Sequence, residues 1–116
     1  MKQAVVWGAG RIGRGFVAEL LFEGDYFVHF VDRDASLVRA LNRQGRYTLY
    51  KARETGLEKC VLAGNFLAHS TDEDLSSLFL QEDCLVDVAV FKNDLESAAE
   101  MLAPYVALRA EKMPRS

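Results

Sequence analysis

Three glycines near the start of the chain stand at a spacing that suits phosphate chemistry. Gly8, Gly10 and Gly13 form a G-x-G-x-x-G pattern directly after the apolar run A-V-V-W. A glycine turn between a strand and a helix lets the backbone approach a pyrophosphate, whose oxygens then meet the helix N–H groups. Asp32 follows 19 positions after Gly13, at the end of the apolar run Y-F-V-H-F-V-D. Strand, glycine pattern, helix, strand and acid in this order predict a dinucleotide site.

Charged residues around the pattern bear on which dinucleotide binds. The Asp32 carboxylate can accept hydrogen bonds from the adenine ribose hydroxyls, whereas a 2′-phosphate would bring a second anion. We therefore predict NAD. Arg33 is of a type that holds a 2′-phosphate, so NADP stays open as an alternative. Arg11 and Arg14 oppose the dipole of the helix that they begin, which favours an anion bound there. The alternative is that both side chains point into solvent.

The elements that must position these residues follow from the apolar pattern. Short apolar runs predict buried parallel strands at residues 3–7, 26–31, 66–69 and 84–91. A helix is predicted over residues 11–23 with Ile12, Phe16 and Leu20 on an inward-facing stripe that Val17 and Leu21 widen. Asp34 is expected to cap a second helix that ends near residues 44–45, and residues 71–80 predict a short third one. His29, inside the second strand, is interpreted as a hydrogen-bonded strand residue.

Two further segments complete the pattern. Residues 46–63 predict a small antiparallel hairpin with its turn at residues 54–56. Asn93 and Glu96 predict a capping box for a last helix, which would turn Leu95, Ala99 and Leu102 inward and end before Pro104.

The predicted fold class is therefore α/β: a Rossmann-type, mostly parallel sheet with helices on both faces and a small hairpin. A complete dinucleotide fold has six strands in the order 3-2-1-4-5-6. The predicted parallel strands supply the first half and only the start of the second, so we expect an incomplete second half. The length of 116 residues predicts a single domain over residues 1–116.

Composition narrows the partners. A net charge of −3 argues against a nucleic-acid surface, and no apolar stretch approaches the roughly 20 residues that span a bilayer. The start of the chain lacks the pattern of a signal peptide. Cys60 and Cys84 lack metal-ligand spacing and are expected to be buried, which predicts no metal site and a reducing cytoplasm. The oligomeric state is left open.

The run G-A-G-R-I-G-R-G-F, followed by V-D-R-D, resembles the mannitol-1-phosphate 5-dehydrogenases of the long-chain polyol dehydrogenase family. The resemblance is strong over residues 1–45 and returns at V-F-K-N-D-L-E. The family commonly has a small residue in place of Phe91. The resemblance implies NAD as cofactor, held by the glycine turn, by the acid and by the loop after the fourth strand: Gly8, Ala9, Gly10, Arg11, Ile12, Gly13, Asp32 and the loop from Val90 to Asn93.

The same resemblance implies hydride transfer between NAD and a polyol phosphate, converting mannitol 1-phosphate to fructose 6-phosphate in the intact protein. The family's catalytic lysine, asparagine and histidine lie in a helical C-terminal domain that this chain does not include, so the chain alone is expected to be inactive. Lys59, Asn65 and His69 repeat those residue types, but their spacing argues against catalysis. Two alternatives stay open: a stand-alone nucleotide-binding or redox-sensing module, and a structural domain with a vestigial motif.

Overall fold

The computed structural model describes residues 2–114. Its elements include a π-helical turn, η1, and a 3₁₀ turn, η2. In chain order they are β1 (Lys2–Trp7), η1 (Gly13–Val17), α1 (Ala18–Glu23), β2 (Tyr26–Asp32), α2 (Ala35–Gln44), β3 (Arg46–Arg53), β4 (Gly56–Ala63), β5 (Phe66–Ser70), α3 (Ser76–Phe79), β6 (Cys84–Val88), η2 (Lys92–Asp94) and α4 (Leu95–Lys112).

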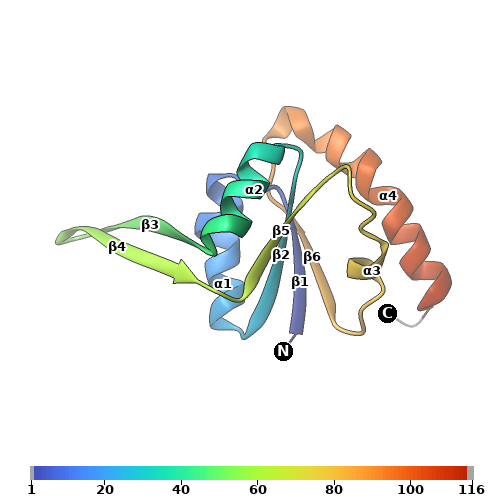
Figure 1. Ribbon diagram of the computed structural model, residues 1–116, viewed down its shortest axis with the longest axis horizontal. Coiled ribbons are helices and arrows are strands. Elements are labelled where there is room, and N and C mark those ends of the chain that lie inside the picture. The colour runs from blue at the N-terminus through green and yellow to red at the C-terminus, as the bar shows by residue number, and fades with distance from the viewer. Residues whose placement is uncertain (1, 115–116) are drawn as a thin grey trace.

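The central sheet contains four parallel strands in the order β5-β2-β1-β6. In Figure 1, α1 and α2 lie on one side of this sheet and α3 and α4 lie on the other. The order matches strands 3-2-1-4 of the Rossmann arrangement. The predicted α/β fold with a mostly parallel sheet and helices on both faces is therefore confirmed.

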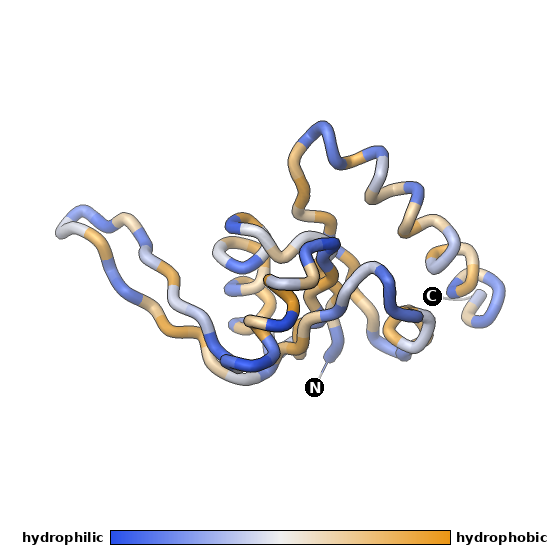
Figure 2. The backbone as a smooth tube through the Cα atoms, turned by 45° about the horizontal axis from the view of Figure 1, so that its top comes forward, coloured by the Kyte–Doolittle hydropathy of each residue, from blue (hydrophilic) through white to orange (hydrophobic). Residues whose placement is uncertain are grey.

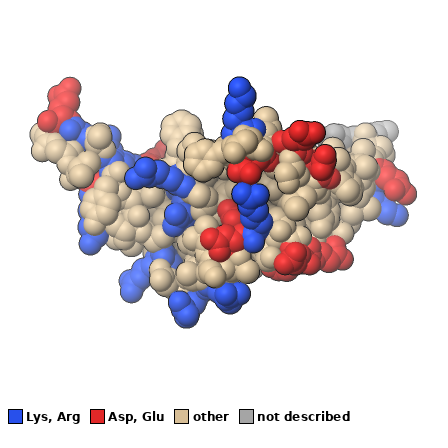
Figure 3. All heavy atoms as spheres, turned by 90° about the horizontal axis from the view of Figure 1, so that it is seen from above, with Lys and Arg blue, Asp and Glu red and all other residues tan. Residues whose placement is uncertain are grey.

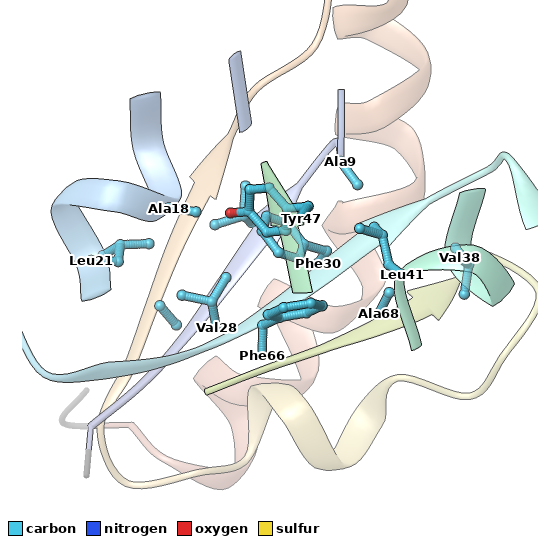
Figure 4. Close-up of a cluster of buried hydrophobic side chains, with 12 residues drawn as sticks. Ala9, Ala18, Leu21, Val28, Phe30, Val38, Leu41, Tyr47, Phe66 and Ala68 are labelled. Atoms are coloured by element: carbon cyan, nitrogen blue, oxygen red, sulfur yellow. The ribbon is translucent and has the colours of Figure 1, made fainter. Parts of the chain in front are cut away.

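Alternating residues of the strands fill two cores, as expected for a sheet that is covered on both faces. In the core beneath α1 and α2, the rings of Phe30, Tyr47 and Phe66 meet edge to face with centroids 5.5–6.1 Å apart. Figure 4 shows these rings between the strands and the helices. In the core beneath α3 and α4, Phe79 stacks on Tyr105 at 5.0 Å.

Strands β3 and β4 form the predicted antiparallel hairpin, closed where Arg53 pairs with Gly56. It projects away from the sheet, and hydrophilic and hydrophobic residues mix along both of its strands (Figures 1 and 2). Two contacts join the hairpin to the first helix: at its base the Tyr47 hydroxyl donates to the Arg14 carbonyl at 2.9 Å, and nearer its turn Lys51 pairs with Glu19. Strand β3 is therefore held against the first helix by two contacts.

The first helix is turned differently from the prediction. Ile12, Phe16 and Leu20 were expected to face inward, but they are 54%, 67% and 57% exposed. Leu21, which was also placed on the apolar stripe, is buried, and Val17 packs against the core. The chain passes through the π-helical turn η1, in which the Ala18 N–H donates to the carbonyl five residues earlier. Ile12 precedes this turn, so the turn bears on Phe16 and Leu20 but does not account for the exposure of Ile12. A π turn contains more residues than an α-helical one, so a stripe drawn at the α-helical period is wrong from that turn onward.

The last helix also departs from the prediction, because α4 continues through Pro104 to Lys112. Proline removes the hydrogen bond to the carbonyl of Glu100, but both residues are exposed, so water can satisfy that carbonyl. Leu95 and Ala99 are exposed; Ala98, Leu102 and Tyr105 face the core instead.

Other boundaries are shorter than predicted. Strand β6 ends at Val88 and α3 spans only Ser76–Phe79. The predicted Asn93 cap is wrong, because the 3₁₀ turn η2 places Asp94 at the N-cap of α4, where its side chain makes no capping bond. Cys60 and Cys84 are partly exposed instead of fully buried: Cys60 lies in the two-stranded hairpin, and Cys84 begins the edge strand β6, where it packs against the core.

Charge is unevenly spread over the described surface. In Figure 3 many of the basic side chains lie toward the hairpin end, while acidic ones gather over the half that contains α3 and α4. The sequence explains part of this, because Asp72, Glu73 and Asp74 are consecutive before α3. The net charge therefore says little about the field at any one site.

Candidate nucleotide-binding site

A cavity of about 450 Å³ lies at the carboxyl edge of the sheet and is lined by the ends of β1, β2 and β6. Strands β1 and β6 are neighbours in the sheet, but the helices that follow them cover opposite faces. Such a switch point is where open α/β sheets bind ligands. The position of the cavity therefore agrees with the sequence motif.

Two glycines of the motif are explained by packing. Gly8 has a φ of +109°, and a Cβ there would lie 2.2 Å from the Ala89 carbonyl oxygen. The Ala89 N–H in turn donates to the Trp7 carbonyl at 2.8 Å, which draws the β6 loop over the turn. A Cβ on Gly13 would lie 2.2 Å from the Gly8 carbonyl oxygen. Both glycines are thus needed for the turn and for the close approach of the helix.

Gly10 is explained differently. It lines the cavity, and a Cβ built on it has no heavy atom within 4 Å. Protein packing therefore does not require glycine here, whereas the approach of a phosphate to the backbone does. Arg11 and Ile12, which open the helix, also line the cavity, and N–H groups of a first helical turn have no partner within the helix. The residues present fit a pyrophosphate.

Asp32 is fixed by two backbone donors. Its Oδ2 accepts from the Ala9 N–H and its Oδ1 from the Asp34 N–H, both at 2.8 Å. The carboxylate is half-buried and lines the cavity. Each carboxylate oxygen has a second lone pair, so the group can still accept from ribose hydroxyls. The two bonds orient the carboxylate and tie the glycine turn to the end of β2.

Arg33, the next residue, is held across the cavity mouth. Its Nη2 donates to Asp94 Oδ1 at 3.2 Å, and the two side chains are 69% and 31% exposed. Arg33 follows β2, whereas Asp94 ends η2 after β6, and both line the cavity. The contact joins the two halves of the site.

The structure places some of the other predicted cofactor residues in the cavity lining and others outside it. Val90 lines the cavity, whereas Asn93 does not. Ala9 is fully buried and contributes its N–H to Asp32. The Arg14 guanidinium lies 5.8 Å from the centre of the Tyr47 ring, at the hairpin base and away from the cavity lining. A role of Arg14 or Asn93 in cofactor binding stays a prediction.

Several lining residues were missed by the sequence reasoning. Thr71 follows β5, and the shared edge of parallel strand ends was a signal that could have found it. Ser97 and Met101 of α4 line the cavity one helical turn apart, but finding them requires the orientation of that helix. Phe91 lies at the margin of the cavity and is 74% exposed, so its ring is not packed in the interior.

The two histidines form a separate network on the sheet. His29 Nδ1 lies 3.0 Å from His69 Nε2, and His29 Nε2 lies 2.8 Å from Gln3 Oε1. Burial, with His69 nearby, lowers the pKa of His29 to about 4. The expected hydrogen-bonded role of His29 is confirmed. Lys59 lies in the hairpin, in a different sheet from His69, so no catalytic set of these residues is assembled.

Two features are absent from the described part of the chain, residues 2–114. No helix there is long and apolar enough to cross a bilayer. No three side chains of His, Cys, Asp or Glu within those residues are grouped so as to hold a metal ion.

Residues 2–115 match the family model described as the mannitol dehydrogenase Rossmann domain. The chain belongs to the mannitol dehydrogenase family. It is 32% identical over 111 residues to mannitol-1-phosphate 5-dehydrogenases of Streptococcus pneumoniae strains JJA and Hungary19A-6. Each alignment covers 94% of this chain and 29% of the relative. The chain thus spans less than a third of the length of these mannitol dehydrogenase relatives.

A solved structure is also similar: a putative 2-dehydropantoate 2-reductase from Enterococcus faecalis, with a TM-score of 0.58 and 19% identity. The match covers 90% of this chain and 30% of that one. At this identity the likeness supports the fold alone, and it agrees with the Rossmann domain of the mannitol dehydrogenase family.

Proposed function

We propose that residues 1–116 are the NAD-binding domain of a dehydrogenase that acts on a polyol phosphate. The observation that carries this proposal is the cavity at the switch point. It combines a glycine with open space at its Cβ position, a helix start and an oriented carboxylate. Membership of the mannitol dehydrogenase family supports the dehydrogenase class.

The residues of this chain would bind and orient the cofactor. Gly10 and the N–H groups that follow it would receive the pyrophosphate, and Asp32 would accept hydrogen bonds from the adenine ribose. Val90 and Phe91, after β6, would line the nicotinamide side. When bound, NAD supplies the acceptor for a hydride from the substrate carbon. The proton of the substrate hydroxyl goes to a base that this chain does not provide.

The relatives suggest the substrate. Their name gives mannitol 1-phosphate as substrate and carbon 5 as the position oxidised. For this protein the same oxidation would yield fructose 6-phosphate, the product that the family resemblance implies. The catalytic groups would lie in the remaining part of such an enzyme, and we propose that this chain alone does not turn over, because catalysis requires both reactants to be held together. The free thiols of Cys60 and Cys84 support a reducing, cytoplasmic setting.

Calorimetric titration of the 116-residue chain with NAD and with ADP-ribose tests the cofactor proposal. Both ligands are expected to bind, and with similar affinity, because the chain's contacts are with the adenosine and pyrophosphate groups. If neither binds at millimolar concentration, the proposal is wrong. Mixing the chain, NAD and mannitol 1-phosphate should produce no NADH, which is measured by the absorbance of the reduced nicotinamide.

A further inference from the structure

The contact between Arg33 and Asp94 bears on the choice between NAD and NADP. Arginine at this place in a Rossmann fold can hold the 2′-phosphate of NADP. Here the guanidinium donates to Asp94 Oδ1 at 3.2 Å, a partner 61 positions away in the sequence. The one cation at the end of β2 that could receive a 2′-phosphate therefore already has an anion.

We propose that Asp94 is a specificity-determining residue, whose carboxylate holds Arg33 and thereby lowers the affinity of the site for NADP. The inference rests on the proposed function of the cavity as an NAD site. It assigns to Asp94 a role that does not follow from the glycine motif or from the acid at the end of β2.

The charges at this end of the cavity support the proposal. Four charged side chains line the cavity, the carboxylates of Asp32 and Asp94 and the guanidinium groups of Arg11 and Arg33, so their formal charges sum to zero. Arg11 stands at the start of the first helix, whereas Arg33 directly follows Asp32 and is paired with Asp94. A ribose hydroxyl is neutral and can donate to Asp32. A 2′-phosphate carries about −1.5 to −2 charges and would have to displace Asp94 from Arg33 to be neutralised.

Exposure sets the size of the effect. The Arg33 side chain is 69% exposed and that of Asp94 31%, so water screens the pair. Exposed ion pairs shift an equilibrium by up to about five-fold, which means that Asp94 restrains Arg33 without immobilising it. The side chain of Asp94 makes no capping bond to α4, so a substitution of Asp94 is not expected to destabilise the helix by loss of its cap.

The test measures dissociation constants of NAD and NADP for the wild-type chain and for Asp94→Asn, which keeps the shape and removes the charge. We expect the affinity for NADP to rise about five-fold in Asp94→Asn and the affinity for NAD to change by less than about two-fold. Glu96→Gln is the matched control. It removes the same charge from the first turn of α4 at an exposed residue outside the cavity lining, and should leave both affinities unchanged.

A double-mutant cycle isolates the route through Arg33. In an Arg33→Ala background, Asp94→Asn should no longer alter the ratio of the two affinities, because the cation for which Asp94 competes is gone. An unchanged ratio in Asp94→Asn, or an effect that persists in the Arg33→Ala background, overturns the inference while NAD binding by wild type still supports the proposed function. If no variant binds either dinucleotide at millimolar concentration, both proposals fail. Circular dichroism verifies that each variant is folded.

Discussion

The side chain of Asp32 has a structural role and a proposed role in cofactor binding. Its oxygens accept from the N–H groups of Ala9 and Asp34, and the same oxygens face the cavity in which the adenine ribose is proposed to bind. Each backbone bond is charge-assisted, a class worth about 1.5–3 kcal/mol. If the proposed function holds, a change at Asp32 would alter both the affinity for the cofactor and the stability of the fold.

Replacing Asp32 should change both the cofactor preference and the free energy of unfolding. In Asp32→Ala we expect the preference for NAD over NADP to fall about ten-fold, because the anion that opposes a 2′-phosphate is gone. The free energy of unfolding should also fall by about 1–3 kcal/mol, because the buried Ala9 N–H loses its acceptor. Calorimetric titration and urea unfolding measure the two effects. A preference that stays as in wild type would refute the role of this carboxylate in cofactor choice.

The glycines allow binding to be separated from folding. Gly10→Ala places a methyl group in open space, so stability should change by less than about 1 kcal/mol while the affinity for NAD falls about ten-fold. Gly8→Ala is the contrasting variant, because its φ and its contact with the Ala89 carbonyl oxygen are both incompatible with a Cβ. It should destabilise the chain by more than about 2 kcal/mol. Equal affinities of wild type and Gly10→Ala for NAD would contradict the proposed phosphate site.

At the scale of elements, the orientation of the first helix can be tested directly. Phe16 is 67% exposed, so Phe16→Ala should change the free energy of unfolding by less than about 1 kcal/mol. Phe30 is fully buried between Tyr47 and Phe66, and Phe30→Ala should cost about 3–5 kcal/mol. Urea unfolding of the two variants compares them. Similar losses would mean that the helix is turned as the apolar pattern first indicated.

The elements that the sequence predicted well are those defined by local rules. The four parallel strands, the hairpin turn before Gly56 and the Asp34 cap of α2 all follow from short-range pattern and turn chemistry, and the structure confirms them. The predictions that failed required tertiary information. Apolar spacing did not reveal the π turn over Gly13–Val17, and the exposure of Pro104, which permits it inside α4, depends on how that helix packs.

The candidate site was predictable to the same extent. The strand-end residues Gly8, Gly10 and Asp32 were found from spacing, because a strand end fixes where its next residues lie. Ser97 and Met101 line the cavity from α4, and Asp94, the partner of Arg33, is the N-cap of the same helix. The apolar periodicity alone did not determine how this helix is rotated. In α4, Leu95 is exposed whereas Ala98, about one turn further along, is buried. No local sequence rule distinguishes these two positions.

At the scale of the whole molecule, the histidine network predicts how stability depends on pH. The folded state lowers the pKa of His29 from 6.5 to about 4, so between these values the unfolded chain binds a proton that the folded chain does not. Stability should therefore decline as the pH falls from 6.5 towards 4, by at most about 1.4 kcal/mol per pH unit for one proton.

The comparison of wild type with His29→Gln isolates this effect, because glutamine can still form hydrogen bonds but does not titrate. Urea unfolding across that pH range should give a shallower pH dependence for the variant. Carboxylates titrate in both proteins, so the difference between the two curves reports His29. Parallel curves would show that the buried imidazole does not set the acid sensitivity of the fold.

The bond from Ala9 to Asp32 also has an evolutionary consequence. A lineage that came to depend on NADP by replacing Asp32 would at the same time leave a buried N–H without an acceptor. It would then need a compensating substitution before the change could be tolerated. The side chain of Asp94, in contrast, accepts no backbone hydrogen bond among its described contacts. Selection for a new cofactor would therefore first favour substitutions at Asp94, which lies 61 positions from Arg33 in the sequence, and not at Asp32.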